Sequence, residues 1–100
     1  MEQYVYIITN KNNTVLYIGQ TNDIVRRLYE HRNGFVNSFS KKYGLYKLLY
    51  LEKYSDAYTA INREKQLKRW TRAKKLALIE KDNPYYKDLG EEYGIVDVDE

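Results

Sequence analysis

Glu64 is the residue of this sequence whose position most suggests a chemical role. It lies on the predicted inner face of a helix, and that face is formed by Ala57, Ala60, Ile61 and Leu67. A carboxylate on an apolar face is costly unless a metal ion or a cation pairs with it. Lys68 follows at the favourable spacing for a helical salt bridge. The sequence therefore leaves a metal ion and a salt bridge open as partners of Glu64.

Arg27 and His31 stand one turn apart on an earlier predicted helix, at the edge of its apolar stripe. A guanidinium in that place can hold a phosphate group, and an imidazole can exchange a proton or bind a phosphate oxygen. A solvated helix flank is the simpler interpretation when the pair is considered alone.

Tyrosines lie on both strands of a predicted hairpin. Tyr4 and Tyr6 share one face of the first strand, and Tyr17 lies on the second. Taken singly, such tyrosines usually pack half-buried in a sheet. Together with the Glu64 carboxylate and the Arg27 guanidinium, these phenols resemble a one-metal phosphodiester site. In such a site a cation neutralises the phosphate and a base activates water for in-line attack.

The charge is unevenly distributed along the 100 residues, although the net charge is only +3. Residues 91–100 hold five of the 14 acidic residues and none of the 17 basic ones, so the first 90 residues carry a marked positive excess. A basic body is typical of a polyanion binder, and a merely solvated surface is the alternative. The basic candidates for nucleic-acid binding are Arg26, Lys68, Arg69, Arg72, Lys74 and Lys75.

Several other chemistries lack their residues. The chain has no cysteine and one histidine, which excludes disulfides and clustered Cys/His metal sites. It also lacks a phosphate-binding loop, a dinucleotide fingerprint, a zinc-protease motif and a serine-hydrolase elbow. No apolar run approaches the length of a membrane span, so we expect a soluble, cytoplasmic protein.

The predicted elements form one domain over residues 1–90, followed by an acidic, disordered tail over residues 91–100. Strands are predicted at 3–9, 14–18 and 47–54, with Gly19 ending the second. A first helix is predicted from the Thr21-Asn22-Asp23 cap to about Arg32, and a second over about 56–69 with Ser55 or Asp56 as its cap. A third is predicted over 72–81 with Thr71 as its cap, ending before Asn83-Pro84. Residues 34–46 are predicted to be a loop, with Phe35 and Phe39 packing under it. The order β-β-α-β-α-α indicates an α+β fold with a small three-stranded sheet covered by helices, and the hairpin makes two strands antiparallel.

These residues, in this order, resemble the GIY-YIG nuclease superfamily. The supporting stretches are YVYIITN, LYIGQTNDIVRRLYEH and INREKQLKRWTRAKKLALIE. The sequence is most similar to the small stand-alone bacterial branch, the UPF0213 (YhbQ-like) proteins, over about residues 3–89. The resemblance implies a GIY-YIG-type domain with a three-stranded antiparallel sheet, which cleaves a DNA phosphodiester with one Mg²⁺ or Mn²⁺ ion.

The resemblance also implies a role for each motif residue. Glu64 matches the metal-ligating glutamate, and Tyr6 and Tyr17 match the two motif tyrosines, of which Tyr6 is favoured as general base. Arg27 would stabilise charge on the phosphate, and His31 would orient water or relay a proton. Gly19 matches the glycine that lets backbone and phosphate approach closely, which adds it to the nucleic-acid-binding candidates.

Two departures from the family pattern affect these expectations. Tyr4 stands where the first motif has glycine, and no separate targeting domain is expected, so a partner protein could supply targeting. The DNA substrate could be branched or damaged. A non-catalytic nucleic-acid-binding module that retains the fold is the alternative function. An intact set of Tyr6, Tyr17, Arg27, His31 and Glu64 favours the enzyme.

Overall fold

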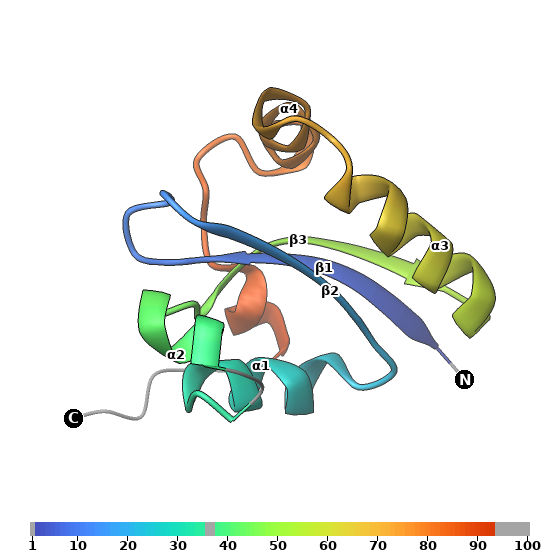
Figure 1. The fold of residues 1–100 in the computed structure, drawn as a ribbon, viewed down its shortest axis with the longest axis horizontal. Helices are drawn as coiled ribbons and strands as arrows, with labels where there is room; N and C mark the ends of the chain where they lie inside the picture. Colours follow the sequence, from blue (N-terminus) through green and yellow to red (C-terminus); the bar gives the residue numbers. More distant parts are fainter. Residues whose placement is uncertain (1, 36–37, 94–100) are drawn as a thin grey trace.

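The computed structural model describes residues 2–35 and 38–93. A three-stranded antiparallel sheet forms its centre, with strand β1 (Gln3–Thr9) between β2 (Leu16–Thr21) and β3 (Lys47–Tyr54). The predicted α+β fold with its three-stranded antiparallel sheet is therefore confirmed. The strand order leaves β2 at one edge of the sheet and β1 at its centre (Figure 1).

Helices cover the two faces of this sheet separately. Helices α1 (Ile24–Arg32) and α2 (Ser38–Tyr43) lie on one face, and α3 (Ala57–Lys68) and α4 (Arg72–Asp82) lie on the other (Figure 1). Alternate residues of β1 contribute side chains to the two hydrophobic cores, since the side chains of a strand alternate between its faces. Val5 and Ile7 pack toward α3 and α4, whereas Tyr6 and Ile8 pack toward α1.

Side-chain caps begin three of the helices where the sequence predicts them. Asp23 accepts a hydrogen bond from the Arg26 amide, Asp56 from the Thr59 amide, and Thr71 from the Lys74 amide. Each cap satisfies a donor that the first helical turn leaves unpaired. These short-range signals explain why the helix starts were predictable from sequence.

Three local predictions were wrong. Residues 34–46 are not a continuous loop, because α2 forms within them, and Phe35 and Phe39 are exposed instead of packing underneath. Gly19 does not end the second strand but pairs with Tyr6 inside β2, which runs on to Thr21. Ala57 and Ile61 were expected on the inner face of α3 but are both exposed, Ile61 by 37%, so only Ala60 and Leu67 of the predicted four are buried.

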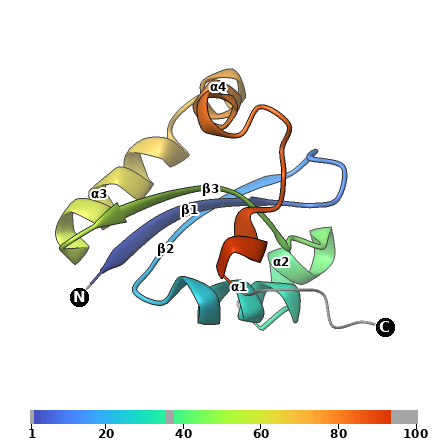
Figure 2. The ribbon, with the colours of Figure 1, turned by 180° about the vertical axis from the view of Figure 1, so that it is seen from behind.

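A clasp of polar contacts holds the segment after α4 against the sheet. Asn83 ends α4, and its side-chain amide donates to the Leu49 and Lys87 carbonyl oxygens. The Asp88 carboxylate accepts from the backbone amide of Leu48 at 3.0 Å and pairs with Arg32 at 2.8 Å. These contacts place the 3₁₀ helix η1 (Leu89–Tyr93) beside β3 and α1 (Figure 2).

The 3₁₀ helix occupies the start of the segment predicted to be an acidic tail. At the start of this 3₁₀ helix the Gly90 amide donates to Asp88, and Leu89 packs against the core that contains Tyr6. The rest of the predicted tail, residues 94–100, lies outside the described residues.

Replacing Asp88 with alanine should destabilise the fold by about 2 kcal/mol, because it leaves two backbone amides and the Arg32 guanidinium without their shared acceptor. Urea unfolding measures this loss. Asp82→Ala, which removes an exposed carboxylate at the end of α4, serves as the matched control and should change stability by less than about 0.5 kcal/mol. Equal losses of unfolding free energy in the two variants would show that the Asp88 contacts do not stabilise the fold.

Candidate active site

The phenol of Tyr6 is the centre of the candidate site. Tyr6 is fully buried in the middle of β1, and its hydroxyl lies 2.9 Å from Nε2 of His31 on α1. Burial raises the pKa of the Tyr6 hydroxyl well above its usual range, helped by Tyr17 and Glu64 and opposed by Arg27. Tyr6 is therefore a neutral phenol at neutral pH in this state, and an added positive charge would be needed to make it a base.

Gly19 provides the space that the Tyr6 ring occupies. The two residues are paired across β1 and β2, and a Cβ atom on Gly19 would lie 2.3 Å from the Tyr6 hydroxyl oxygen. Real Cβ atoms do not approach other atoms this closely, so a side chain here would displace the ring. The structure thus gives Gly19 a packing role toward Tyr6. The contact with phosphate that the family resemblance implies for Gly19 stays a prediction.

His31 connects Tyr6 to α2. The imidazole is buried, and its Nδ1 lies 2.7 Å from the hydroxyl oxygen of Ser40. Burial and, to a smaller extent, the nearby Arg27 charge lower the pKa of His31 to about 4 against the opposing effect of Glu30. A neutral imidazole has one donor and one acceptor nitrogen, so His31 links Tyr6 and Ser40 in a single hydrogen-bonded chain.

Tyr17 and Arg27 complete the group beside the phenol. The Tyr17 ring on β2 lies 5.1 Å from the His31 ring and 6.5 Å from the Tyr6 ring, measured between centroids. Arg27 on α1 is partly buried, pairs with Glu30 at 3.3 Å, and acts electrostatically on both Tyr6 and His31. Four of the five predicted residues are thus brought together on one side of the sheet.

Glu64 approaches the group from α3, which covers the other face of the sheet. Its side chain is 19% exposed and pairs with Lys68 at 3.3 Å, so the predicted salt bridge is present. Its charge nevertheless reaches the Tyr6 hydroxyl. Because the Lys68 side chain is 53% exposed, the pair contributes little stability, and the carboxylate can exchange this partner for another cation.

The residues around Glu64 fit a hard divalent cation. The described residues contain no group of three or more His, Cys, Asp or Glu side chains that could hold a metal ion. Magnesium does not need such a group, because it keeps several waters and is commonly held by one or two carboxylates together with substrate phosphates. A half-buried carboxylate whose charge acts on the Tyr6 phenol is compatible with that mode of binding.

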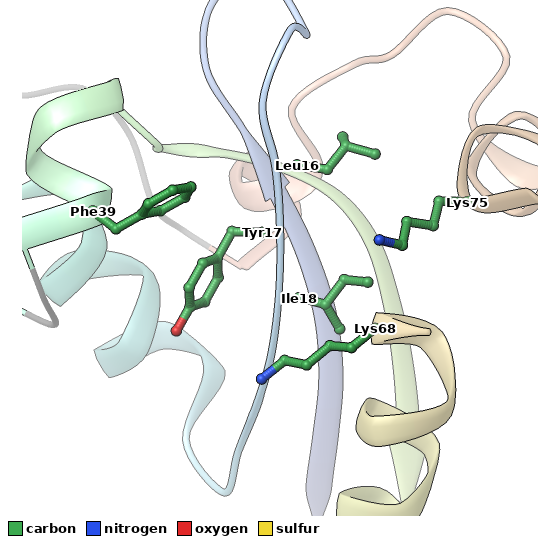
Figure 3. Close-up of a pocket in the computed structure, with 6 residues that line it drawn as sticks. All are labelled: Leu16, Tyr17, Ile18, Phe39, Lys68 and Lys75. Atoms are coloured by element: carbon green, nitrogen blue, oxygen red, sulfur yellow. The ribbon is translucent and has the colours of Figure 1, made fainter. Parts of the chain in front are cut away.

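The basic candidates for nucleic-acid binding are divided in the structure. Lys68 and Lys75 line a shallow pocket beside β2 (Figure 3). Others serve the fold: Arg72 donates to the Asn13 carbonyl oxygen at 2.9 Å, and Lys74 lies over the Trp70 ring. Arg26 is exposed and pairs with Glu30, and Arg69 caps the end of α3.

Sequence reasoning missed Ser40 and the position of Phe39. Ser40 is buried against His31, and Phe39 lies 6.1 Å from the Tyr17 ring, measured between centroids. Both residues come from α2, a helix of six residues whose apolar pattern is too short to be recognised. A serine within a Gly- and Lys-bearing segment carries no signal that it will meet a histidine nine residues earlier.

Comparison with known proteins identifies the family of this chain. The family model described as the GIY-YIG catalytic domain matches residues 2–77, so the chain belongs to the GIY-YIG family. Within that family it is one of the UPF0213 proteins. The described residues include no helix long and apolar enough to cross a membrane.

The UPF0213 relatives match this chain over nearly their whole length. A UPF0213 protein of Clostridium perfringens is 36% identical over 90 residues, covering 86% of this chain and 96% of the relative. One from Syntrophus aciditrophicus is 39% identical over 84 residues, covering 83% and 94%. The solution NMR structure of a UPF0213 protein from Bacillus halodurans has a TM-score of 0.56 at 27% identity, covering 88% of this chain and 93% of that one.

The pKa of His31 can be measured without ambiguity, because this is the only histidine. An NMR titration of its ring protons should give a value of about 4 instead of the ordinary 6.5. Since the unfolded state binds the proton more tightly, stability should be complete above pH 6.5 and fall by about 3 kcal/mol as the pH drops toward 4. The variant His31→Gln should lack this part of the pH dependence. A folded-state value near 6.5 would contradict the buried neutral imidazole.

Adding a methyl group at Gly19 should displace the Tyr6 ring. We expect Gly19→Ala to destabilise the protein by about 2 kcal/mol, measured by urea unfolding, because the added Cβ overlaps the phenol. In a Tyr6→Leu background the shorter side chain leaves room, so the same substitution should cost much less. Additive effects of the two substitutions would show that Gly19 does not act through Tyr6.

Proposed function

We propose that this protein is a divalent-metal-dependent endonuclease that hydrolyses DNA phosphodiester bonds. The observation that carries the proposal is the arrangement of Tyr17, Arg27 and His31 around the Tyr6 phenol. The Glu64 carboxylate also acts electrostatically on this phenol. Membership of the GIY-YIG family supports it, because the matching model describes a catalytic domain.

Glu64 would hold one Mg²⁺ or Mn²⁺ ion, displacing the Lys68 ammonium that now pairs with it. The ion would neutralise the phosphate and stabilise negative charge on it. A positive charge near Tyr6 also lowers the pKa of the phenol and so offsets the effect of burial.

Tyr6 and His31 together form a path for one proton. In the tautomer with hydrogen on Nδ1, the imidazole donates to Ser40 and its Nε2 accepts from the Tyr6 hydroxyl. Once substrate binding opens the Tyr6 hydroxyl, which is covered in this structure, to an attacking water, Tyr6 would accept a proton from that water while passing its own proton to Nε2. The Arg27 guanidinium would stabilise negative charge that develops on the phosphate.

Replacing Glu64 with glutamine tests the proposal, because it preserves shape and removes the charge that would hold the cation. Supercoiled, branched and single-stranded DNA are incubated with wild type and with Glu64→Gln in Mg²⁺ or Mn²⁺. We expect the cleavage rate of the variant to fall about 100-fold or more, with DNA binding in EDTA retained. Glu80→Gln on α4 is the matched control and should cleave like wild type.

Equal cleavage by wild type and Glu64→Gln would refute the role of Glu64. Salt-dependent DNA binding by a wild-type protein that cleaves none of these substrates would instead identify a non-catalytic nucleic-acid-binding module.

A further inference from the structure

A shallow pocket of about 260 Å³ opens along the edge strand β2, next to the candidate active site. Residues from both layers of helices line it, together with the strand itself: Leu16, Tyr17, Ile18, Phe39, Lys68 and Lys75. Figure 3 shows aromatic side chains on one side of β2 and the two lysines on the other. The two sides of the pocket therefore offer different chemistry to one bound molecule.

The aromatic side is a row of three rings that leads outward from the active site. Tyr17, which contacts His31, lies 6.1 Å from Phe39, and Phe39 lies 4.7 Å from Tyr43, measured between ring centroids. Phe39 is 41% exposed, and Tyr43 is exposed to a similar extent. An exposed aromatic side chain beside a polar site is available to stack on a flat partner.

The lysine side carries the positive charge. The side chains of Lys68 and Lys75 extend from α3 and α4 toward β2 and line the pocket together with Leu16 and Ile18 (Figure 3). Lys68 is also the present partner of Glu64. The Lys68 side chain is 53% exposed, so its ammonium can contact a backbone phosphate while it stays paired with Glu64.

We infer that this pocket binds an unpaired nucleotide, with its base stacked on Phe39 and its backbone phosphates held by Lys68 and Lys75. In a duplex, neighbouring bases cover both faces of every base, so the Phe39 ring could stack only on a base that has left the duplex. The small volume also suits one nucleotide. The substrate segment beside the cleaved bond is therefore single-stranded. This inference rests on the proposed function, since it specifies the substrate of the same site.

Binding of a labelled 12-nucleotide single strand, and of the matching duplex, tests the inference by fluorescence anisotropy in EDTA, where no cleavage occurs. Phe39→Leu keeps an apolar side chain but removes the ring, and should weaken single-strand binding about tenfold with less than a twofold change for duplex. Phe39→Tyr keeps the ring and should bind like wild type. Tyr85→Leu removes an aromatic side chain that is 82% exposed elsewhere, and should also bind like wild type.

Lys75→Gln gives an independent measurement of the phosphate contact. It should weaken single-strand binding and reduce the slope of log affinity against log salt by about 0.7. Thermal unfolding of each variant confirms that the fold is retained.

Single-strand affinity that is unchanged in Phe39→Leu, or that falls no more than duplex affinity, would overturn the inference, as would a wild-type protein that does not bind the single strand. Because the assay contains no divalent cation, it separates the two proposals. If the wild type cleaves no DNA but Phe39→Leu loses single-strand affinity, only the nuclease assignment is refuted. If the wild type cleaves DNA but Phe39→Leu keeps its single-strand affinity, only the nucleotide pocket is refuted.

Discussion

The contact between the buried Tyr6 hydroxyl and His31 is the interaction on which the rest of the site depends. It joins the central strand to α1, and it requires that Gly19 on the neighbouring strand carry no side chain. The pairing of Tyr6 with Gly19 fixes the register of β1 and β2. A slip of one residue would place Ile18 or Gln20 opposite the phenol and turn the tyrosines to the other face. Strand register and site geometry are thus set by the same pair of residues.

The site lies where both faces of the sheet can contribute to it. Arg27 and His31 come from α1 on one face, whereas Glu64 comes from α3 on the other. Since β2 is an edge strand, side chains from both layers of helices can meet along it. The same geometry brings Phe39 and Lys75 to one pocket. An edge that could otherwise pair with another strand is flanked here by lysines, which also discourage such pairing.

The charge of Arg27 opposes the effect of burial at Tyr6 and reinforces it at His31. Burial keeps both Tyr6 and His31 neutral, while Arg27 favours the ionised phenol and disfavours the protonated imidazole. The pair is consequently held in the neutral forms that can pass a proton between them. A nearby cation would favour the ionised form of the Tyr6 phenol. A carboxylate such as Glu64 can bind a cation of this kind.

The sheet, three helix starts and the five motif residues could all be predicted from local signals in the sequence. Those signals are the Tyr-, Val- and Ile-rich strands, the Asp23, Asp56 and Thr71 caps, and the order of the motifs. Long-range packing in the folded chain sets the rest: Gly19 lies inside β2, Ser40 meets His31, and Ile61 is exposed while Glu64 is half-buried. These features depend on contacts between segments that are far apart in the sequence. A local pattern of residues holds no information about such contacts.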